Sequence, residues 1–150
     1  MNNWLMKSEP DTFSIDDLER VRVEPWNGVR NYQARNMIRD QMRAGALAFF
    51  YHSSCAIPAI AGVMEITGAA YPDPTAFDSS SPYYDPQSSP DKPRWYAIDV
   101  RFIRRLERLI TLQELKNHPV LLELPLLQRG NRLSVMPVPI RQWEYILSLE

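Results

Sequence analysis

Residues 96–102 read Tyr-Ala-Ile-Asp-Val-Arg-Phe, and this alternation decides the fold class. In an extended strand, the first, third, fifth and seventh of these side chains lie on one face and the others lie on the opposite face. Two further runs, 46–52 and 58–67, show part of the same period-two order. We therefore predict strands over these two runs and over about 95–106, joined in a mostly antiparallel sheet or barrel.

Shorter elements are expected around these strands. The chain has two capping-box patterns that open helices, at Ser14 and at Thr111, and Asn31 and Pro139 suit the first positions of two others. No βαβ rhythm is present, so the fold class is α+β, with about five or six strands in a small barrel and short peripheral helices. The remaining expected elements are strands at 3–7 and 132–135, and helices over 14–20, 31–43 and from 139 onward.

Length and composition bound the class of protein. With 150 residues and 45% hydrophobic content, the chain has the size of one domain, which we expect to span 1–150. Cys55 is the only cysteine, so an internal disulfide is impossible, and no Cys/His spacing for zinc exists. No signal peptide or membrane-spanning run is found, so we expect a cytoplasmic monomer without membrane contact. A net charge of −1 excludes nucleic-acid binding through bulk positive charge.

The stretch at 26–36 carries the strongest functional signal. It combines aromatic rings on which a base could stack, forked guanidinium donors, and amides that both donate and accept hydrogen bonds. Gly28 allows a tight turn or a close approach of the backbone to a ligand. The alternative is a Trp-anchored turn that leads into an ordinary amphipathic helix. The stretch reads Trp26-Asn27-Gly28-Val29-Arg30-Asn31-Tyr32-Gln33-Ala34-Arg35-Asn36.

Two neighbouring features could serve the same function. Arg35, Arg39 and Arg43 recur at every fourth position of the expected helix, which makes a basic stripe, although such a stripe is usually only a solvated flank. Residues 69–93 hold six prolines, no glycine and four aromatic residues. A loop of this length is usually functional or disordered, and its aromatics favour an ordered lid that packs against the sheet.

Candidates for catalysis are few. His52 and Ser53 are adjacent on a strand and would point to opposite faces, so they do not make a catalytic pair, and a His at a strand end is more often structural. Lys7 and Glu9 could be tuned for acid/base work if they were close and desolvated. A charged turn is the alternative. The sequence holds no phosphate loop or dinucleotide fingerprint, and we expect no cofactor and no metal.

Seven ordered motifs resemble those of the EVE-domain family, which includes many small bacterial proteins, and they cover essentially the whole chain. They are WLMKSEP at 4–10, WNGVRNYQARN at 26–36, FFYHS at 49–53, AYPD at 70–73, YYDP at 83–86, PRW at 93–95 and RLSV at 132–135.

The resemblance implies a PUA-like fold, a mixed β pseudo-barrel related to the YTH and ASCH domains, with a pocket for a modified base from DNA or RNA. Asn27 stands where the family pattern leads us to expect Asp, and Met136 where it leads us to expect Gln, which could change the base that is chosen. The residues that the resemblance places in the pocket are Ser8, Glu9, Trp26, Asn27, Gly28, Val29, Arg30, Asn31, Tyr51, His52, Arg132, Leu133 and Ser134.

The function expected from the residues and the resemblance together is non-catalytic. The pocket would capture a modified base, such as a methylcytosine, from single-stranded or locally opened DNA or RNA, with Trp26 stacking on the base. Arg30, Arg35 and Arg39 would meet the phosphates. The alternative is a small amidohydrolase acting on a modified nucleobase, with Lys7 and Glu9 as its acid and base. That alternative requires both side chains in one concave pocket.

Overall fold

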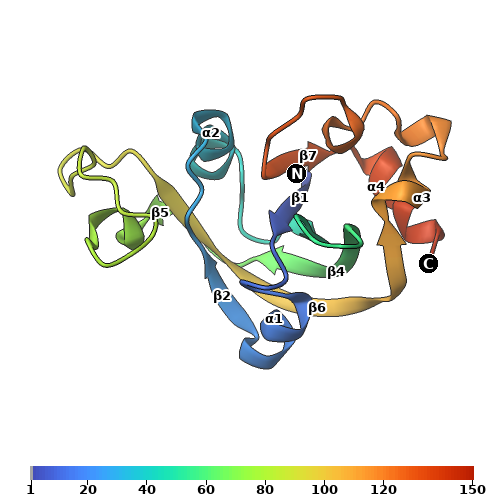
Figure 1. Cartoon of the computed structure of the whole chain (residues 1–150), viewed down its shortest axis with the longest axis horizontal. Helices are drawn as coiled ribbons and strands as arrows, with labels where there is room; N and C mark the ends of the chain where they lie inside the picture. The colour runs from blue at the N-terminus through green and yellow to red at the C-terminus, as the bar shows by residue number, and fades with distance from the viewer. Residues whose placement is uncertain (1) are drawn as a thin grey trace.

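A mixed sheet of seven strands is the centre of the structure, a computed structural model that describes residues 2–150 (Figure 1). Short helices and a long loop surround the sheet. The strands are β1 (Asn3–Ser8), β2 (Val23–Trp26), β3 (Leu47–His52), β4 (Ala59–Ile66), β5 (Tyr71–Pro72), β6 (Tyr96–Thr111) and β7 (Val135–Val138). The α-helices are α1 (Ile15–Val21), α2 (Tyr32–Asp40), α3 (Leu112–Leu115) and α4 (Ile140–Ser148), and the 3₁₀ turns are η1 (Pro74–Phe77), η2 (Pro119–Leu121) and η3 (Pro125–Leu127).

The first strand lies inside the sheet. The strand order is β2-β6-β4-β3-β1-β7, and β5 pairs with β6 outside this path. β1 runs parallel to β3 and antiparallel to β7, and the other described pairs are antiparallel. This arrangement confirms the predicted antiparallel character, with the β1–β3 pair as the exception, and puts the carboxyl end of β1 beside the end of β3.

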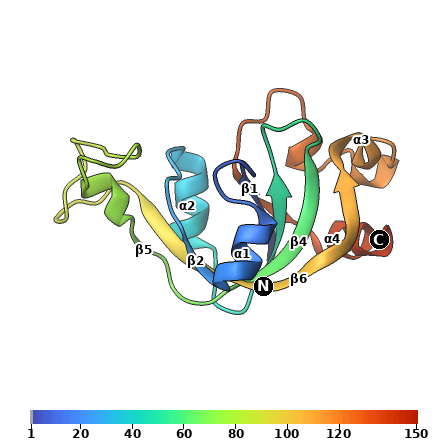
Figure 2. The same cartoon turned by 60° about the horizontal axis from the view of Figure 1, so that its bottom comes forward.

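The sheet curves into a pseudo-barrel. The register shifts once between β3 and β4 and twice between β4 and β6, and such bulges bend strands. Gly62 lies at one of these shifts, where a Cβ atom would be 2.5 Å from Cδ1 of Ile15 and 2.9 Å from the carbonyl oxygen of Arg104. Only glycine lets α1 approach the sheet there. Helix α2, which Figure 2 shows on the same side of the molecule as β2, contacts β6 and β7, and these two strands lie toward opposite ends of the strand order. The result is the α+β pseudo-barrel that the sequence predicts, and it agrees with the PUA-like fold that the family resemblance implies.

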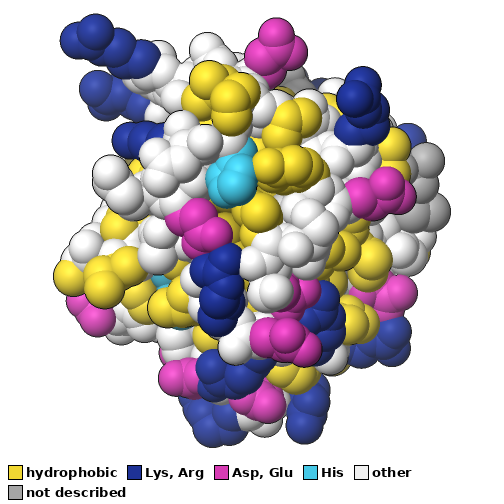
Figure 3. Space-filling view, turned by 90° about the vertical axis from the view of Figure 1, so that its right-hand side faces the viewer, with side chains coloured by type: hydrophobic (Ala, Val, Ile, Leu, Met, Phe, Trp, Pro, Cys, Tyr) yellow, Lys and Arg dark blue, Asp and Glu magenta, His cyan; other side chains and the backbone are white. Residues whose placement is uncertain are grey.

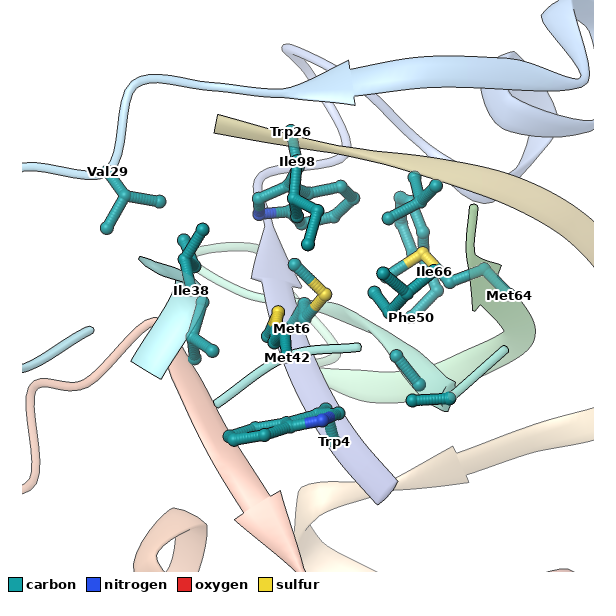
Figure 4. Close-up of a cluster of buried hydrophobic side chains, with 14 of the residues drawn as sticks. Trp4, Met6, Trp26, Val29, Ile38, Met42, Phe50, Met64, Ile66 and Ile98 are labelled. Atoms are coloured by element: carbon teal, nitrogen blue, oxygen red, sulfur yellow. The ribbon is translucent and has the colours of Figure 1, made fainter. Parts of the chain in front are cut away.

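Each face of the sheet carries its own hydrophobic core. Alternation along β3 sends Ala48 and Phe50 to one face and Phe49 and Tyr51 to the other. The first core contains Trp4, together with residues of α1 and α2, and is drawn in Figure 4. The second core lies under α3, α4 and the 3₁₀ turns η2 and η3. Strands β1, β3, β4 and β7 therefore contribute to both cores and are covered on both sides, as their apolar composition requires.

Several predicted boundaries need correction. The strand predicted at 132–135 begins only at Val135, because β7 pairs with β1 through Val135–Val138. Strand β6 runs five residues past its predicted end, α2 stops at Asp40 instead of about 43, and β2 and β5 were not predicted. The helix starts are confirmed: Ser14 and Asp17 form a complete capping box, and the side chain of Asn31 accepts a hydrogen bond from the backbone N–H of Ala34.

The loop at 69–93 packs against the body of the domain, as predicted. The hydroxyl of Tyr71 donates to a carboxylate oxygen of Asp99 at 2.6 Å, and Trp95, just after the loop, donates from Nε1 to Asp85 at 2.7 Å. The ring of Trp95 also stacks on Tyr32 at the start of α2, with 4.7 Å between centroids. Among residues 2–150, none of the helices has the length and apolar character needed to cross a membrane.

Candidate functional site

A cavity of about 750 Å³ opens where β1 and β2 end. This volume lies within the ~300–1,000 Å³ typical of small-ligand sites. Its wall comes from five segments that lie far apart in the sequence. The lining residues are Lys7, Ser8, Glu9, Thr12, Phe13, Glu24, Pro25, Trp26, Asn27, Gly28, Val29, Arg30, Asn31, Ser53, Ser54, Tyr83, Arg132 and Ser134.

Backbone hydrogen bonds hold three of these segments together at the end of β1. The N–H of Lys7 donates to the carbonyl of Ser134 at 2.8 Å, and the N–H of Ser53 donates to the carbonyl of Ser8 at 2.9 Å. The hydroxyl of Ser8 donates its hydrogen to the carbonyl of Phe13 at 2.6 Å. The Ser8 hydroxyl can therefore only accept a hydrogen bond from a ligand.

The turn after β2 depends on Gly28, whose φ is +79°. A Cβ atom at this position would lie 2.7 Å from Cζ of Tyr83, so the ring of Tyr83 packs directly on the Gly28 backbone. Both the positive φ and this contact require glycine. Tyr83 keeps 38% of its surface exposed and lines the cavity. It is thus an aromatic surface that a base could reach.

The guanidinium of Arg30 binds the 69–93 loop, so it is not available for the phosphate contact that the sequence analysis predicts. Its Nη1 donates to the carboxylate of Asp73 at 3.0 Å, and its Nη2 donates to Thr75 at 3.1 Å and to the carbonyl of Tyr83 at 2.7 Å. The guanidinium also lies over the rings of Tyr83 and Trp95. These contacts use most of its N–H groups, so Arg30 fastens the loop to the turn at 27–31.

Trp26 lines the cavity but exposes only 7% of its surface. Its ring packs edge-to-face against Phe50, with centroids 5.5 Å apart, and Figure 4 shows it among the residues of the first core. The part of the ring that a base could cover is therefore small. Trp26 builds the wall of the site and links it to the core.

Three residues predicted for the pocket do not line it. Tyr51 is 2% exposed in the second core, on the opposite sheet face from Trp26, and burial raises its pKa to about 12. His52 accepts a hydrogen bond from the first N–H of α1, that of Ile15, at 3.1 Å, and burial lowers its pKa. His52 therefore has a structural role, which the sequence analysis gives as the usual one for a histidine at the end of a strand. Leu133 lines a neighbouring cavity instead.

The basic stripe on α2 is engaged with its own surroundings. Arg35 donates to the carbonyl of Arg94 at 2.8 Å and lies over the ring of Tyr32, and Arg39 pairs with Asp40 at 2.8 Å. Neither lines the cavity. Their predicted contact with phosphates stays a prediction. Arg132, by contrast, lines the cavity, is exposed, and forms no ion pair within residues 2–150.

The cavity carries both signs of charge. Lys7 and Glu9 both line it, which meets the condition set for an acid/base pair. Burial lowers the pKa of Lys7. Burial, together with the nearby charge of Asp17, raises the pKa of Glu24. The carboxylates can accept hydrogen bonds from amino groups of a base, and Lys7 can donate to its carbonyl oxygens.

Sequence reasoning missed two cavity residues that matter. Tyr83 belongs to the YYDP motif, so the motif was noticed although this residue was not assigned to the site. Glu24 lies in β2, which was not predicted because it contains Pro25. Proline is disfavoured inside sheets and tolerated on edge strands, and β2 is an edge strand. An edge strand just before the Trp26 turn is the signal that could have found Glu24.

The fold and the cavity define a small α+β pseudo-barrel with a polar and aromatic ligand pocket. Residues 2–149 match the EVE domain, and the chain belongs to this family. Human thymocyte nuclear protein 1 is 43% identical over 167 residues, which cover 99% of this chain and 74% of the human protein. An uncharacterized protein of Schizosaccharomyces pombe is 43% identical over 97% of this chain and 67% of its own length.

Solved structures show the same fold. A protein from Pseudomonas syringae has a TM-score of 0.95 and 52% identity, with 98% of each chain covered. The human THYN1 protein in complex with 5-methylcytosine containing DNA has a TM-score of 0.91 and 42% identity, covering 99% of this chain and 97% of that one. An ASCH protein from Zymomonas mobilis, at 11% identity and a TM-score of 0.58, shares the fold. This chain is therefore homologous to a DNA-binding protein.

Proposed function

We propose that the cavity between the ends of β1 and β2 captures a modified base, such as 5-methylcytosine, from single-stranded or locally opened DNA or RNA. The observation that carries this proposal is the cavity of about 750 Å³ in a chain whose fold matches, at a TM-score of 0.91, a relative bound to DNA containing 5-methylcytosine. Taking a base out of a duplex costs a few kcal/mol, and less from a single strand. Contacts between the base and the pocket must contribute at least this much favourable free energy.

Hydrogen bonds from the pocket determine which base binds. Glu9 would accept from the amino group of a cytosine, a pairing that carboxylates make with cytosine N4. Ser8 has only acceptor capacity left, and Ser134 and the free amide nitrogen of Asn31 add further polar contacts. Each such bond contributes ~0.5–1.5 kcal/mol net. The edge of the base, more than its methyl group, would therefore decide what binds.

Aromatic contact supplies much of the affinity. Stacking on an aromatic ring contributes ~1–3 kcal/mol per base. Because Trp26 is almost fully buried and Tyr83 is 38% exposed, Tyr83 offers the larger stacking surface and Trp26 a smaller contact at the wall. A methyl group adds ~0.8 kcal/mol when it is buried against such a wall. Discrimination between cytosine and 5-methylcytosine would then be only several-fold.

A titration tests this function directly. Fluorescence anisotropy would compare wild type on DNA and RNA oligonucleotides that carry one cytosine or one 5-methylcytosine, in single strands and in duplexes. The expected result is tighter binding to the modified oligonucleotide, with single strands bound at least as well as duplexes. Equal affinity for both bases in every polymer would overturn the proposal.

A second candidate function, base hydrolysis, rests on one observation. Lys7 and Glu9 line the same cavity, and burial lowers the pKa of Lys7 below its ordinary value, which makes its ammonium group a stronger proton donor. The test is mass spectrometry of modified nucleosides and oligonucleotides after long incubation with the protein. A new product that wild type forms and Lys7→Met does not would establish this function. Binding without turnover would reject it.

A further inference from the structure

A row of aromatic rings and guanidinium groups leads from the cavity to α2. Tyr83 and Arg30 line the cavity, and the guanidinium of Arg30 lies 5.6 Å from the centroid of Tyr83. The same guanidinium lies over the ring of Trp95, at 5.4 Å. Trp95 stacks on Tyr32, with centroids 4.7 Å apart, and the guanidinium of Arg35 lies 4.8 Å from the centroid of Tyr32. This row extends the wall of the cavity to the first turn of α2.

The outer end of the row is open to solvent. Tyr32 is 52% exposed, whereas Trp95, on which it stacks, is 6% exposed. Tyr32 directly follows Asn31, which lines the cavity, and consecutive Cα atoms are about 3.8 Å apart. A nucleotide joined to one whose base lies in the cavity can therefore reach the ring of Tyr32. Such a ring accepts any base, because every base has a π-face.

The guanidinium of Arg35 is held in place by uncharged groups. Its Nη1 donates to the carbonyl of Arg94 at 2.8 Å, and its Nε donates to Oδ1 of Asn36 at 3.0 Å. Neither acceptor neutralises the charge. Within residues 2–150, no hydrogen bond engages its Nη2. Arg35 is thus oriented in advance and keeps both its positive charge and a donor for a ligand.

Arg94 places a second cation beside this one. It precedes Trp95, is half-buried, and forms no ion pair in the part of the chain that the structure describes. The carboxylate of Asp85, on the same loop, accepts from Nε1 of Trp95 at 2.7 Å and from the N–H of Gln87 at 2.9 Å. The hydrogen bond from Trp95 is the largest cause of the lowered pKa of Asp85, and the charge of Arg94 is a smaller one. Asp85 is therefore near Arg94 without being paired to it.

The charges around Tyr32 sum to a positive balance. Residues 31–43 hold three arginines and one carboxylate, Asp40, which pairs with Arg39. Residues 83–96 hold two cations and two carboxylates, so they do not reverse that balance. The whole chain, by contrast, has a net charge of −1. Positive charge is thus concentrated at the end of the row.

Arginines elsewhere on the domain are arranged differently. On the face that carries α3 and α4, basic side chains lie beside acidic ones (Figure 3). All four arginines of β6 pair with carboxylates, and Arg104 with Glu150 and Arg108 with Glu114 are two of these pairs. Paired arginines have less charge to offer a phosphate than Arg35 and Arg94 have.

From these contacts we infer that Tyr32, Arg35 and Arg94 form a second site for single-stranded nucleic acid, which holds the nucleotide next to the captured base. The inference rests on the proposed function, since the base in the cavity positions its neighbour. The neighbouring base lies against Tyr32 and Arg35, and Arg94 binds its phosphate. A duplex keeps that base stacked and paired, so this site favours single strands. It recognises the presence of a base and not its identity.

Abasic substitution tests the inference, because it removes a base and leaves the phosphate. Single-stranded DNA oligonucleotides would carry one 5-methylcytosine, with the nucleotide on its 5′ or its 3′ side either intact or abasic. On one of the two sides, the abasic nucleotide should weaken binding about 5- to 150-fold. Each of the four bases at that position should restore most of the affinity.

Variants assign this effect to the site. Tyr32→Ala should bind the intact and the abasic oligonucleotide equally, whereas Tyr32→Phe should keep the difference. Tyr84→Ala is the matched control, because Tyr84 is 43% exposed and lies outside the row, and it should behave as wild type.

The salt dependence tests the cation separately. Arg94→Ala should reduce the slope of log affinity against log salt by about 0.7 on single strands. Arg141 is an exposed arginine of α4 that forms no ion pair within residues 2–150 and lines neither cavity. The slope of Arg141→Ala should therefore equal that of wild type.

The outcomes separate this inference from the proposed function. Equal affinity for intact and abasic neighbours on both sides, with 5-methylcytosine still preferred over cytosine, overturns the second site and leaves the cavity standing. A dependence on the neighbouring base that Tyr32→Ala leaves unchanged also overturns it, as does a wild-type salt slope for Arg94→Ala. Equal affinity for 5-methylcytosine and cytosine overturns the proposed function, and with it the place of this site beside a captured base.

Discussion

The carboxylate of Asp73 has no exposed side-chain surface, and Nη1 of Arg30 donates to it at 3.0 Å. The same carboxylate accepts from the N–H of Gly28 at 2.8 Å and from the N–H and hydroxyl of Thr75. One buried side chain thus ties the turn that lines the cavity to the loop that carries Tyr83. This contact therefore helps to hold that loop over the site.

Loss of this carboxylate should cost much of the stability of the domain. Asp73→Ala leaves Arg30 and the Gly28 N–H without their acceptor, and breaking a buried ion pair costs ~3–5 kcal/mol. Because Arg30 is 23% exposed, we expect the lower end of that range. Urea unfolding measures the change. Asp78→Ala, a carboxylate in the exposed part of the same loop, is the matched control and should cost less than half as much.

The same residue predicts a pH dependence. Burial alone would raise the pKa of Asp73, but hydrogen bonds from Thr75, Gly28 and Arg30 outweigh it, so the net pKa lies below the ordinary 3.8. A lowered folded-state pKa stabilises the fold above the unfolded pKa, and this stability is lost as pH falls through the folded value. Unfolding free energies of wild type and Asp73→Asn should therefore converge as pH falls below 3.8. A constant difference down to acid unfolding would contradict the assignment.

Gly28→Ala should be destabilising for two separable reasons. The positive φ costs a residue with Cβ ~1–2 kcal/mol, and the Cβ would lie 2.7 Å from the Tyr83 ring. A double-mutant cycle with Tyr83→Ala divides the two. The Gly28→Ala change should cost less in the Tyr83→Ala background, and the remaining cost measures the backbone term alone. Additive effects would show that the ring moves aside freely.

Tyr83 should matter for binding and its neighbour should not. Tyr83→Ala removes the more exposed aromatic surface of the cavity, so affinity for a 5-methylcytosine oligonucleotide should fall about 5- to 150-fold. Tyr84 is exposed to a similar degree, 43%, and does not line the cavity. Tyr84→Ala is therefore the control, measured by the same titration. Equal losses in the two variants would mean that the loop, and not the ring, contributes the affinity.

Arg132 should account for one phosphate contact. Arg132→Ala should reduce the slope of log affinity against log salt by about 0.7 on single strands, with little change in the preferred base. Arg129→Ala removes an exposed arginine from the same segment that lines neither cavity, and its slope should equal that of wild type. Arg35→Ala tests the earlier prediction for α2. A reduced slope there would extend the backbone path to that helix.

Strands and helices were predictable where side-chain alternation or a capping residue marks them in the sequence. Alternation located β6, and capping residues located the starts of α1 and α2, because both signals act within a few residues. Strand β2 escaped notice because Pro25 is tolerated only at the sheet edge, and the sheet edge is a tertiary property. The start of β7 is likewise set by its pairing with β1, and not by residues 132–134.

The residues of the site were likewise predictable where a local pattern places them and not where tertiary contacts do. Ser8, Glu9 and the turn after Trp26 line the cavity, and each lies at the end of a strand or directly after it. Tyr51 was wrongly placed, since alternation along β3 sends it to the face away from Trp26. Arg30 resembled a phosphate ligand in sequence, but its buried partner is 43 positions away, beyond the reach of any local pattern.

The interior position of β1 has a consequence for synthesis of the chain. Trp4, Leu5 and Met6 are all 0% exposed, and they lie in a strand whose two neighbours are β3 and β7. A nascent chain leaving the ribosome thus carries these apolar side chains without a complete sheet until residues 135–138 have been made. Unpaired apolar strands of this kind aggregate readily. The sheet therefore cannot close until β7 has been made, and chaperones that shield β1 until then should raise the yield of folded protein.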